Sequence, residues 1–230
     1  MDDIALFSAT GDRYAEELAR GLKLTGESAE YFARHRIARV RELTCGAGLD
    51  VRGILDFGCG TGSSFALLRA AFPSARVLGF EPADGLRALA ERAATAAGAE
   101  VVRGSTLTLS AAVDIVYCNG VFHHIPRGER DTAMAAVARA LRPGGLACVW
   151  ENSPYNPGTR VIMSRVPFDR GAVLLQPREL RARLRDARLA PERTEYHFVF
   201  PRILRFARPL EALVRSLPLG GQYVVTARRA

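Results

Sequence analysis

The glycine-rich segment Asp56-Phe57-Gly58-Cys59-Gly60-Thr61-Gly62 constrains the fold of this chain more than any other feature. It follows a short apolar run at residues 53–57 and precedes a run with helical periodicity at residues 63–72, so it connects a predicted strand to a predicted helix. Alternating glycines let the backbone turn sharply and approach a ligand closely, because no Cβ is in the way. At the carboxyl end of a parallel strand, such a loop is typical of nucleotide-like ligands.

The glycine spacing and two acidic residues narrow the class of ligand. A dinucleotide fingerprint requires a glycine where this chain has Ser63, and a P-loop requires a Gly-Lys-Ser/Thr that the sequence lacks. Asp56 would repel a pyrophosphate, but it suits a ligand that carries an ammonium group. Glu81 lies about 20 residues after the loop, where an acid accepts hydrogen bonds from both ribose hydroxyls.

Helical and strand patterns alternate along the rest of the chain, which predicts an α/β fold with a mostly parallel sheet. Further strands are predicted at residues 75–80, 100–102, 113–118 and 146–150, and further helices at 83–97 and 128–141. Residues 11–44 are predicted to be helical, with a break at Thr25-Gly26. Beyond Glu151 the pattern predicts a loop with a short helix at 152–168, a helix at 177–188, strands at 194–200 and 222–226, and a basic amphipathic stretch at 201–219.

Four elements in order resemble the class I S-adenosylmethionine-dependent methyltransferases. They are the glycine loop, Glu81, the strand end Asp114–Ile125, and the turn Leu141-Arg142-Pro143-Gly144-Gly145, over about residues 50–151. The resemblance implies a Rossmann-like, seven-stranded, mostly parallel sheet with helices on both faces and an antiparallel last strand. We expect one domain, with an N-terminal helical cap at residues 1–50, a cofactor-binding core at 51–151 and an acceptor side at 152–230.

The resemblance also implies S-adenosylmethionine as cofactor and assigns roles to matching residues. Asp56 and the loop backbone would hold the methionine end and the adenosine, Glu81 the ribose, and Asn119 would line the cofactor near the sulfonium. Many family members carry an acid after the third strand, where this chain has Ser105, so recognition of the adenine departs from the pattern there. The predicted cofactor-binding residues are Asp56, Phe57, Gly58, Cys59, Gly60, Thr61, Gly62, Glu81, Pro82, Ser105, Asn119 and Gly120.

The predicted catalytic residues are His123, His124, Glu151 and Tyr155. A histidine at the end of the fourth strand titrates near neutral pH and could act as a base; alternatively, one imidazole caps backbone groups while the other packs on the next helix. We predict no metal, because two adjacent histidines have no acidic third ligand nearby in the sequence. The polar segment 151–156 either contacts the acceptor or only sets the geometry of a turn-rich loop.

The N-terminal helices carry aromatic and charged residues that could shape an acceptor pocket, as they often do in this family: Tyr14, Tyr31, Phe32, Arg34, His35 and Arg36. Tyr31 and Arg36 could reach the cofactor carboxylate or the acceptor. The alternative for each residue is packing in the core or on the surface.

The net charge of +8 lies entirely in the last third of the chain. Residues 1–150 hold 17 basic and 17 acidic residues, whereas residues 151–230 hold 15 and 7, which indicates an anionic partner. The stretch 200–210 is basic and apolar together. It could be an acceptor lid, a dock for a carrier protein or a contact with an anionic membrane, or an amphipathic helix packed on the sheet; Pro209 counts against the membrane.

Three further features bear on the setting of the protein. The cysteines at positions 45, 59, 118 and 148 have no metal-like spacing, so we expect reduced structural thiols. No apolar run is long enough to span a membrane, and the start Met1-Asp2-Asp3 is acidic where a signal peptide would be basic. We therefore expect a cytoplasmic location.

The sequence thus favours methyl transfer to O or N of a small molecule, such as a sugar, a lipid-linked precursor or a secondary metabolite. The alternatives are an RNA or protein methyltransferase, which the lack of an aromatic-basic RNA module argues against, and a non-catalytic protein that binds S-adenosylmethionine. A nicotinamide dehydrogenase is opposed by Asp56 and Ser63. Asn152-Ser153-Pro154-Tyr155 only superficially resembles the N-P-P-Y motif of DNA-methylating enzymes, which follows strand four, so no DNA partner is predicted.

Overall fold

The computed structural model describes residues 14–169 and 171–230, and within them seven strands form one sheet of order β3-β2-β1-β4-β5-β7-β6. Strands β1 to β4 pair in parallel with their neighbours, as do β4 and β5, whereas β7 runs antiparallel to both β5 and β6. The strands are β1 (Gly53–Phe57), β2 (Arg76–Phe80), β3 (Glu100–Val102), β4 (Val113–Asn119), β5 (Leu141–Asn152), β6 (Leu189–His197) and β7 (Gln222–Arg229). This arrangement confirms the predicted Rossmann-like architecture with an antiparallel last strand.

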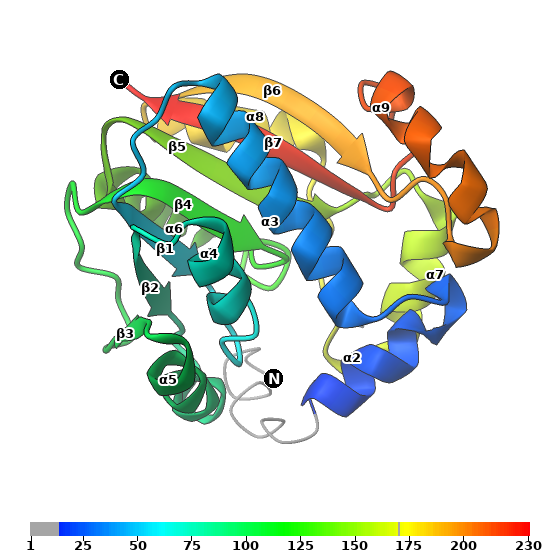
Figure 1. Cartoon of the computed structure of the whole chain (residues 1–230), viewed down its shortest axis with the longest axis horizontal. Coiled ribbons are helices and arrows are strands. Elements are labelled where there is room, and N and C mark those ends of the chain that lie inside the picture. Colours follow the sequence, from blue (N-terminus) through cyan, green and yellow to red (C-terminus); the bar gives the residue numbers. More distant parts are fainter. Residues whose placement is uncertain (1–13, 170) are drawn as a thin grey trace.

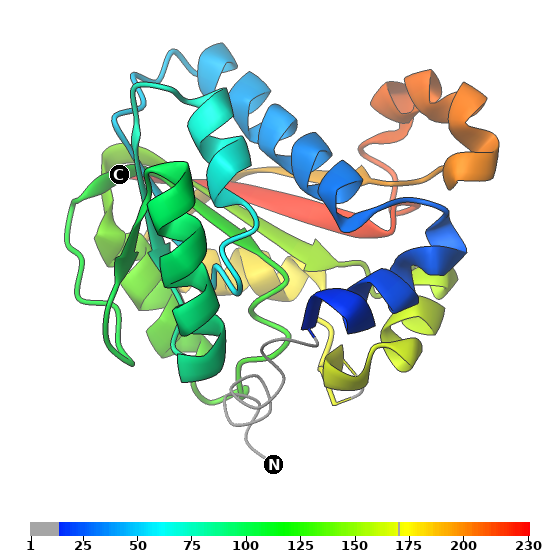
Figure 2. The same cartoon turned by 60° about the horizontal axis from the view of Figure 1, so that its bottom comes forward.

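Helices cover both faces of the sheet (Figure 1). The α-helices are α2 (Tyr14–Leu22), α3 (Ala29–Gly46), α4 (Phe65–Ala71), α5 (Asp84–Ala97), α6 (Arg130–Ala140), α7 (Pro157–Arg165), α8 (Pro177–Asp186) and α9 (Glu211–Val214). The described residues also form three 3-10 segments: η2 (Lys23–Thr25), η3 (Pro167–Asp169) and η4 (Arg202–Leu210). Helix α2 lies beside α7, far from it in sequence (Figure 2).

The alternation of side chains along the strands divides the interior into two hydrophobic cores. Ile54 of β1 faces one core, which contains residues of α3, α4 and α5 such as Ile37 and Phe65. The next residue, Leu55, faces the other core, which contains Met134 of α6 together with residues of α8. The central strands are buried on both faces, which explains why their sequences are mostly apolar, with polar residues such as Asp56 and Asp114 near their ends.

Two strands begin earlier than the sequence predicts. Strand β5 begins at Leu141, which pairs with Val113, and the register then shifts so that Leu146 pairs with Ile115. The glycine-rich turn expected before the strand is therefore a bulge within it. Strand β6 begins at Leu189 and includes Pro191, where its pairing with β7 is irregular. Proline is tolerated there because β6 is an edge strand of the sheet.

The N-terminal helices break where the sequence predicts, at Gly26, whose φ is 73°. Ser28 then caps α3 by accepting a hydrogen bond from the Tyr31 amide. Residues 11–13 of the predicted helix and the acidic start at residues 1–3 lie outside the described residues, as does the side chain of Tyr14. No helix formed by residues 14–169 or 171–230 has the length and hydrophobicity needed to span a bilayer.

The basic stretch 201–219 differs from an amphipathic helix packed on the sheet. It forms η4 and the short α9, which stand away from the sheet (Figure 2). Its large apolar side chains face solvent, with Ile203 84% and Phe206 78% exposed. The buried Glu211 anchors the segment by accepting hydrogen bonds from the amides of Val199 and Phe200, at 3.1 and 2.9 Å. The packed-helix alternative is therefore wrong.

The cysteines lie where the strand assignments predict. Cys118 on β4 and Cys148 on β5 are buried, as is Cys59 in the glycine loop, whereas Cys45 is exposed. All four are free thiols in this structure.

Candidate functional site

The glycine loop turns away from β1 through backbone conformations that residues other than glycine rarely adopt. Gly58 and Gly60 have φ values of 72° and 55°, and a Cβ at Gly58 would lie 2.4 Å from Cγ2 of Val121. The amides of Gly58 and Cys59 both donate to the carbonyl of Phe80, at 2.8 and 3.0 Å. The loop is thereby fastened to the end of β2, next to the predicted ribose-binding acid.

Glu81 is held against the loop by two backbone amides. Its Oε2 accepts from Gly60 at 2.9 Å and its Oε1 from Ala83 at 3.0 Å. Burial raises the pKa of Glu81, while these two hydrogen bonds oppose the rise. Each carboxylate oxygen keeps a further lone pair, so both can still accept a hydrogen bond from a hydroxyl, as the predicted role requires.

Asp56 and Asn119 present buried acceptor atoms at the ends of adjacent strands. Oδ2 of Asp56 and Oδ1 of Asn119 find no hydrogen-bond donor among the described residues, and Asp56 is only 2% exposed. Burial raises the pKa of Asp56 to about 7, with a hydrogen bond from Ser64 opposing and the charge of Glu81 adding to the rise. Because an unpaired buried acceptor is costly, these atoms fit a ligand that brings cationic or N–H donors, as the predicted cofactor does.

Arg36 of α3 connects the helical cap to the sheet. It is buried, and it donates from Nε to the hydroxyl of Tyr117 at 3.1 Å and from a terminal nitrogen to Oε1 of Gln222 at 3.0 Å. The structure therefore brings this predicted residue to the carboxyl edge of the sheet, within electrostatic reach of Asp56.

The other N-terminal residues separate into two groups. Tyr31 lies under the guanidinium of Arg208, 4.6 Å from ring centroid to Cζ, and Phe32 makes an edge-on contact with Phe198. Both line the cavity described below. His35 instead pairs with His197 at 3.0 Å, and Arg34 forms an exposed ion pair with Glu30; for these two the structure supports a packing or surface role.

A cavity of about 500 Å³ opens beyond the carboxyl ends of β4 and β5. Its walls come from α2, α3, α7 and the segment leading into η4, and most of them are apolar. Asn119 and Gly120 border it, whereas Asp56, the glycine loop and Glu81 do not. The ionisable side chains that line it are Glu27, Tyr31, Arg36, His123, His124, Asp169 and Arg208.

His123, which lines this cavity, forms a buried pair with Glu151, which lies behind it and does not line the cavity. Nδ1 of His123 lies 2.6 Å from Oε2 of Glu151, whose Oε1 accepts from the amide of Phe122 at 2.8 Å. Both side chains are almost inaccessible to solvent. Burial by itself lowers the pKa of His123, but the charges and hydrogen bonds of Glu151 and Asp169 outweigh it and raise that pKa to about 10.

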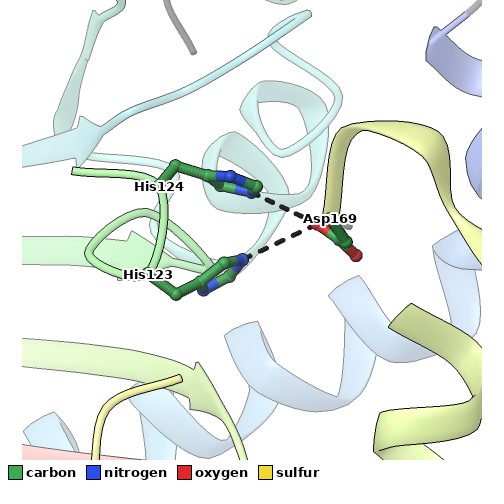
Figure 3. A group of neighbouring side chains, drawn as sticks. All are labelled: His123, His124 and Asp169. Carbon is green, nitrogen blue, oxygen red and sulfur yellow. Dashed lines mark ion pairs between the residues drawn. The ribbon is translucent and has the colours of Figure 1, made fainter. Parts of the chain in front are cut away.

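Asp169 joins this group from η3, and sequence reasoning missed it. Its Oδ1 lies 3.3 Å from Nε2 of His124 and 3.8 Å from Nε2 of His123 (Figure 3). Burial raises the pKa of Asp169, but the two imidazoles lower it to about 2. Burial and the neighbouring His123 lower the pKa of His124. No sequence signal links Asp169 to the histidines, because its proximity depends on how the irregular segment after α7 returns to the sheet.

The remaining predicted residues are placed less centrally. Tyr155 is 49% exposed and lines a second hollow beside Arg160, which shares Met163 and Asp169 with the cavity. Asn156 caps α7 by accepting from the amide of Thr159, so part of the segment 151–156 sets local geometry. Ser105 is exposed after β3, and Pro82 is half-buried beside Glu81.

The chain matches known proteins over this part of the sheet. A family model described as "Methyltransferase domain" matches residues 54–145. The chain is 28% identical over 137 residues to trans-aconitate 2-methyltransferase of Azoarcus sp. (strain BH72), covering 59% of this chain and 53% of the relative. It is 40% identical over 96 residues to malonyl-[acyl-carrier protein] O-methyltransferase of Methylococcus capsulatus, covering 40% of this chain and 34% of the relative. The chain thus matches about half the length of these relatives, or less.

The fold resembles a solved structure over the whole chain. Magnesium protoporphyrin IX methyltransferase from Synechocystis, with bound S-adenosylmethionine, superposes with a TM-score of 0.63 at 17% identity. The match covers 100% of this chain and 98% of that protein. At this identity the likeness shows a shared fold.

Proposed function

Because this chain belongs to the class I S-adenosylmethionine-dependent methyltransferase family, we propose that it transfers the cofactor's methyl group to a carboxylate oxygen of an acidic small molecule. The cofactor is S-adenosylmethionine. The acceptor is the proposed part, and the observation that carries it is the cavity next to Asn119, which Arg36 and Arg208 line.

The residues of the chain divide into those that would bind the cofactor and those that would face the acceptor. Asp56 would bind the ammonium group of the cofactor and Glu81 its ribose hydroxyls. When bound, the cofactor supplies a methyl group on a positively charged sulfur. Transfer is then an in-line displacement, for which alignment of the two reactants can contribute about 7–11 kcal/mol.

A carboxylate acceptor suits the donors in the cavity. Guanidinium groups bind carboxylates through paired N–H donors in a planar fork. Arg36 has five N–H donors, and Tyr117 and Gln222 accept from two of them. Arg208 is held at the wall by an ion pair with Glu27 at 2.7 Å and by its contact with Tyr31.

The names of the relatives point in the same direction. Aconitate and the malonyl group both carry free carboxylates, and those relatives are named as methyltransferases of these compounds. A carboxylic acid has an ordinary pKa near 4 and is ionised at neutral pH. Its oxygen needs no general base, so the reaction requires positioning more than proton transfer.

We also propose that η4, beside the cavity, binds an anionic membrane surface. Phe200, Pro201 and Arg208, at the base of η4, line the cavity, and the exposed Ile203 and Phe206 stand beside the exposed Arg202 and Arg205. Exposed apolar side chains interleaved with arginines are typical of segments that bind anionic lipid surfaces. An acidic carrier protein is the competing partner, and a vesicle assay separates the two.

The proposed reaction is tested with methyl-labelled S-adenosylmethionine and a panel of di- and tricarboxylic acids, each paired with its amide. We expect label in an alkali-labile ester with an acid and none with the matching amide. At cofactor concentrations near the wild-type Kd, Asp56→Asn should lower the signal, because it weakens cofactor binding. Label found only in RNA or protein would refute the proposal, and cofactor binding without any product would indicate a non-catalytic protein.

A further inference from the structure

Three side chains at the floor of the cavity converge on a common point. They are His123 and His124, which follow β4, and Asp169, which ends η3; we call them the histidine–aspartate cluster. Both imidazole rings direct Nε2 toward Oδ1 of Asp169 (Figure 3). One ligand atom from each residue lies within 4.8 Å of the other two.

The distances within this group are of two kinds. The contact between His123 and Glu151 is 2.6 Å, which is a short, charge-assisted hydrogen bond. The two contacts to Asp169 are 3.3 and 3.8 Å, and the second is too long for a hydrogen bond. Bonds of about 2.0–2.2 Å from a tetrahedral cation place two ligand atoms about 3.3–3.6 Å apart. The Asp169 contacts lie at or slightly beyond that range.

We propose that the histidine–aspartate cluster is a binding site for one divalent transition-metal ion, with Nε2 of His123, Nε2 of His124 and Oδ1 of Asp169 as its protein ligands. Two imidazoles and one carboxylate suit Zn²⁺, Co²⁺, Mn²⁺ or Fe²⁺ better than Mg²⁺ or Ca²⁺, which take mainly oxygen ligands.

The surroundings of the cluster match those of known metal sites. A metal-bound histidine usually donates its other ring N–H to a carboxylate, which fixes the ring orientation. Glu151 has this position at Nδ1 of His123, and it is itself held by the amide of Phe122. The loop is also fixed by a 3.1 Å hydrogen bond from the amide of Val173 to the carbonyl of His123.

The cluster has room for a further ligand. All three residues line the cavity, so the remaining coordination position would face it, as in sites that keep one position open for water or substrate. This part of the inference rests on the proposed function: the open position would take a carboxylate oxygen of the acceptor and hold it beside the cofactor-lining Asn119.

Cobalt titration of the chelator-treated full chain tests the site without requiring activity. Tetrahedral Co²⁺ with nitrogen ligands absorbs in the visible range, so we expect a signal that saturates at one equivalent and is displaced by Zn²⁺. Asp169→Ala and His124→Ala should each weaken binding at least tenfold. Glu151→Gln should weaken it about 10–100-fold, because it removes the carboxylate behind His123. His35→Ala, in the other histidine pair, is the matched control and should bind normally.

Circular dichroism confirms that each variant is folded. The absence of one-to-one cobalt binding to the wild-type chain would overturn the proposal and leave the cluster as an ion pair. Unchanged binding in both Asp169→Ala and His124→Ala would overturn it as well. Because this titration contains neither cofactor nor acceptor, its failure is distinct from failure of the carboxylate assay.

Discussion

The two sides of the carboxyl edge of the sheet are built in different ways. The side proposed to bind the cofactor contains Asp56, the glycine loop and Glu81, which all lie within residues 56–81 around one strand–loop–helix connection and the next strand. The side proposed to bind the acceptor is formed by α2, α3, the loop after β4, η3 and the segment after β6. A binding motif whose residues are close in the sequence can therefore be predicted from the sequence. The cavity cannot, because segments that are distant in the sequence form its walls. The following predictions test whether this division is also functional.

Replacing Glu151 should have the largest effect on stability, because its carboxylate is buried behind His123 on the acceptor side. Glu151→Leu leaves His123 and the amide of Phe122 without their partner, and breaking such a buried pair costs about 3–5 kcal/mol of unfolding free energy. Urea denaturation followed by circular dichroism measures it. Glu192→Leu is the control, since its pair with Arg228 is partly exposed and such pairs contribute about 0–1 kcal/mol. Equal losses of unfolding free energy in both variants would contradict the distinction between the buried and the exposed ion pair.

Variants on the side proposed to bind the cofactor should weaken cofactor binding and leave the fold intact. Asp56→Asn removes the charge opposite the ammonium group, and a hydrogen bond to a charged group contributes about 1.5–3 kcal/mol, or about 10–150-fold in Kd. Calorimetric titration with S-adenosylhomocysteine measures this. Asp84→Asn, on the exposed start of α5, should bind as the wild type does. Normal affinity in Asp56→Asn would mean that the loop binds the ligand differently.

Cofactor affinity should also fall in acid, because Asp56 has a pKa of about 7 in the folded chain. Below pH 7 the carboxyl takes a proton and loses its attraction for the ammonium group, so Kd should rise by up to about tenfold per pH unit. The stability of the unliganded chain should depend on pH in the opposite direction. Since the folded pKa exceeds the ordinary value near 4, the stability of the unliganded chain should decrease as pH rises from about 4 to 7.

Calorimetry at pH 6, 7 and 8 measures the pH dependence of binding. In Asp56→Asn the dependence of both binding and stability should flatten. A wild-type Kd that is the same at pH 6 and pH 8 would assign the ammonium group to another acceptor.

Arg208→Ala should weaken binding of the acceptor and leave binding of the cofactor unchanged. Losing one charged donor at the cavity wall should raise KM for the acid by about tenfold, while the affinity for S-adenosylhomocysteine stays unchanged. Arg205→Ala, on the same 3-10 segment but absent from the cavity wall, is the matched control. If Arg208→Ala weakened cofactor binding as much as acceptor binding, the two sides would not be functionally separate.

The smallest effect on stability should come from the exposed surface of η4. Ile203→Asp with Phe206→Asp removes two solvent-facing side chains, so the free energy of unfolding should change by no more than about 0.5 kcal/mol. Flotation with phosphatidylserine vesicles should nevertheless be lost. Wild-type protein that fails to float, yet binds an acidic carrier protein, would move the partner from a membrane to a protein.

Prediction from the sequence succeeded where the pattern is local and failed where the contacts are distant. The first four strands were located to within one residue, because buried parallel strands are short apolar runs bounded by clear breaks. The start of β6 was not found, since Pro191 and its charged neighbours become a strand only by pairing with β7. His123, His124 and Glu151 were identified as candidates because each follows a strand that ends at the same edge. Tyr155 satisfied the same rule, but it does not line the cavity; it lines a neighbouring hollow that shares Asp169 with it.

The sequence by itself indicated the family and the cofactor, because Asp56, the glycine spacing and Glu81 all lie within one strand–loop–helix connection and the next strand, where their spacing along the chain can be read. Only the tertiary structure decided the acceptor side. Asp169 contacts the histidines (Figure 3), and Arg36 and Arg208 line one cavity, although α3, η3 and the segment after β6 are far apart in the sequence. Such proximity depends on how helices and loops pack over the sheet, and no spacing along the chain encodes it.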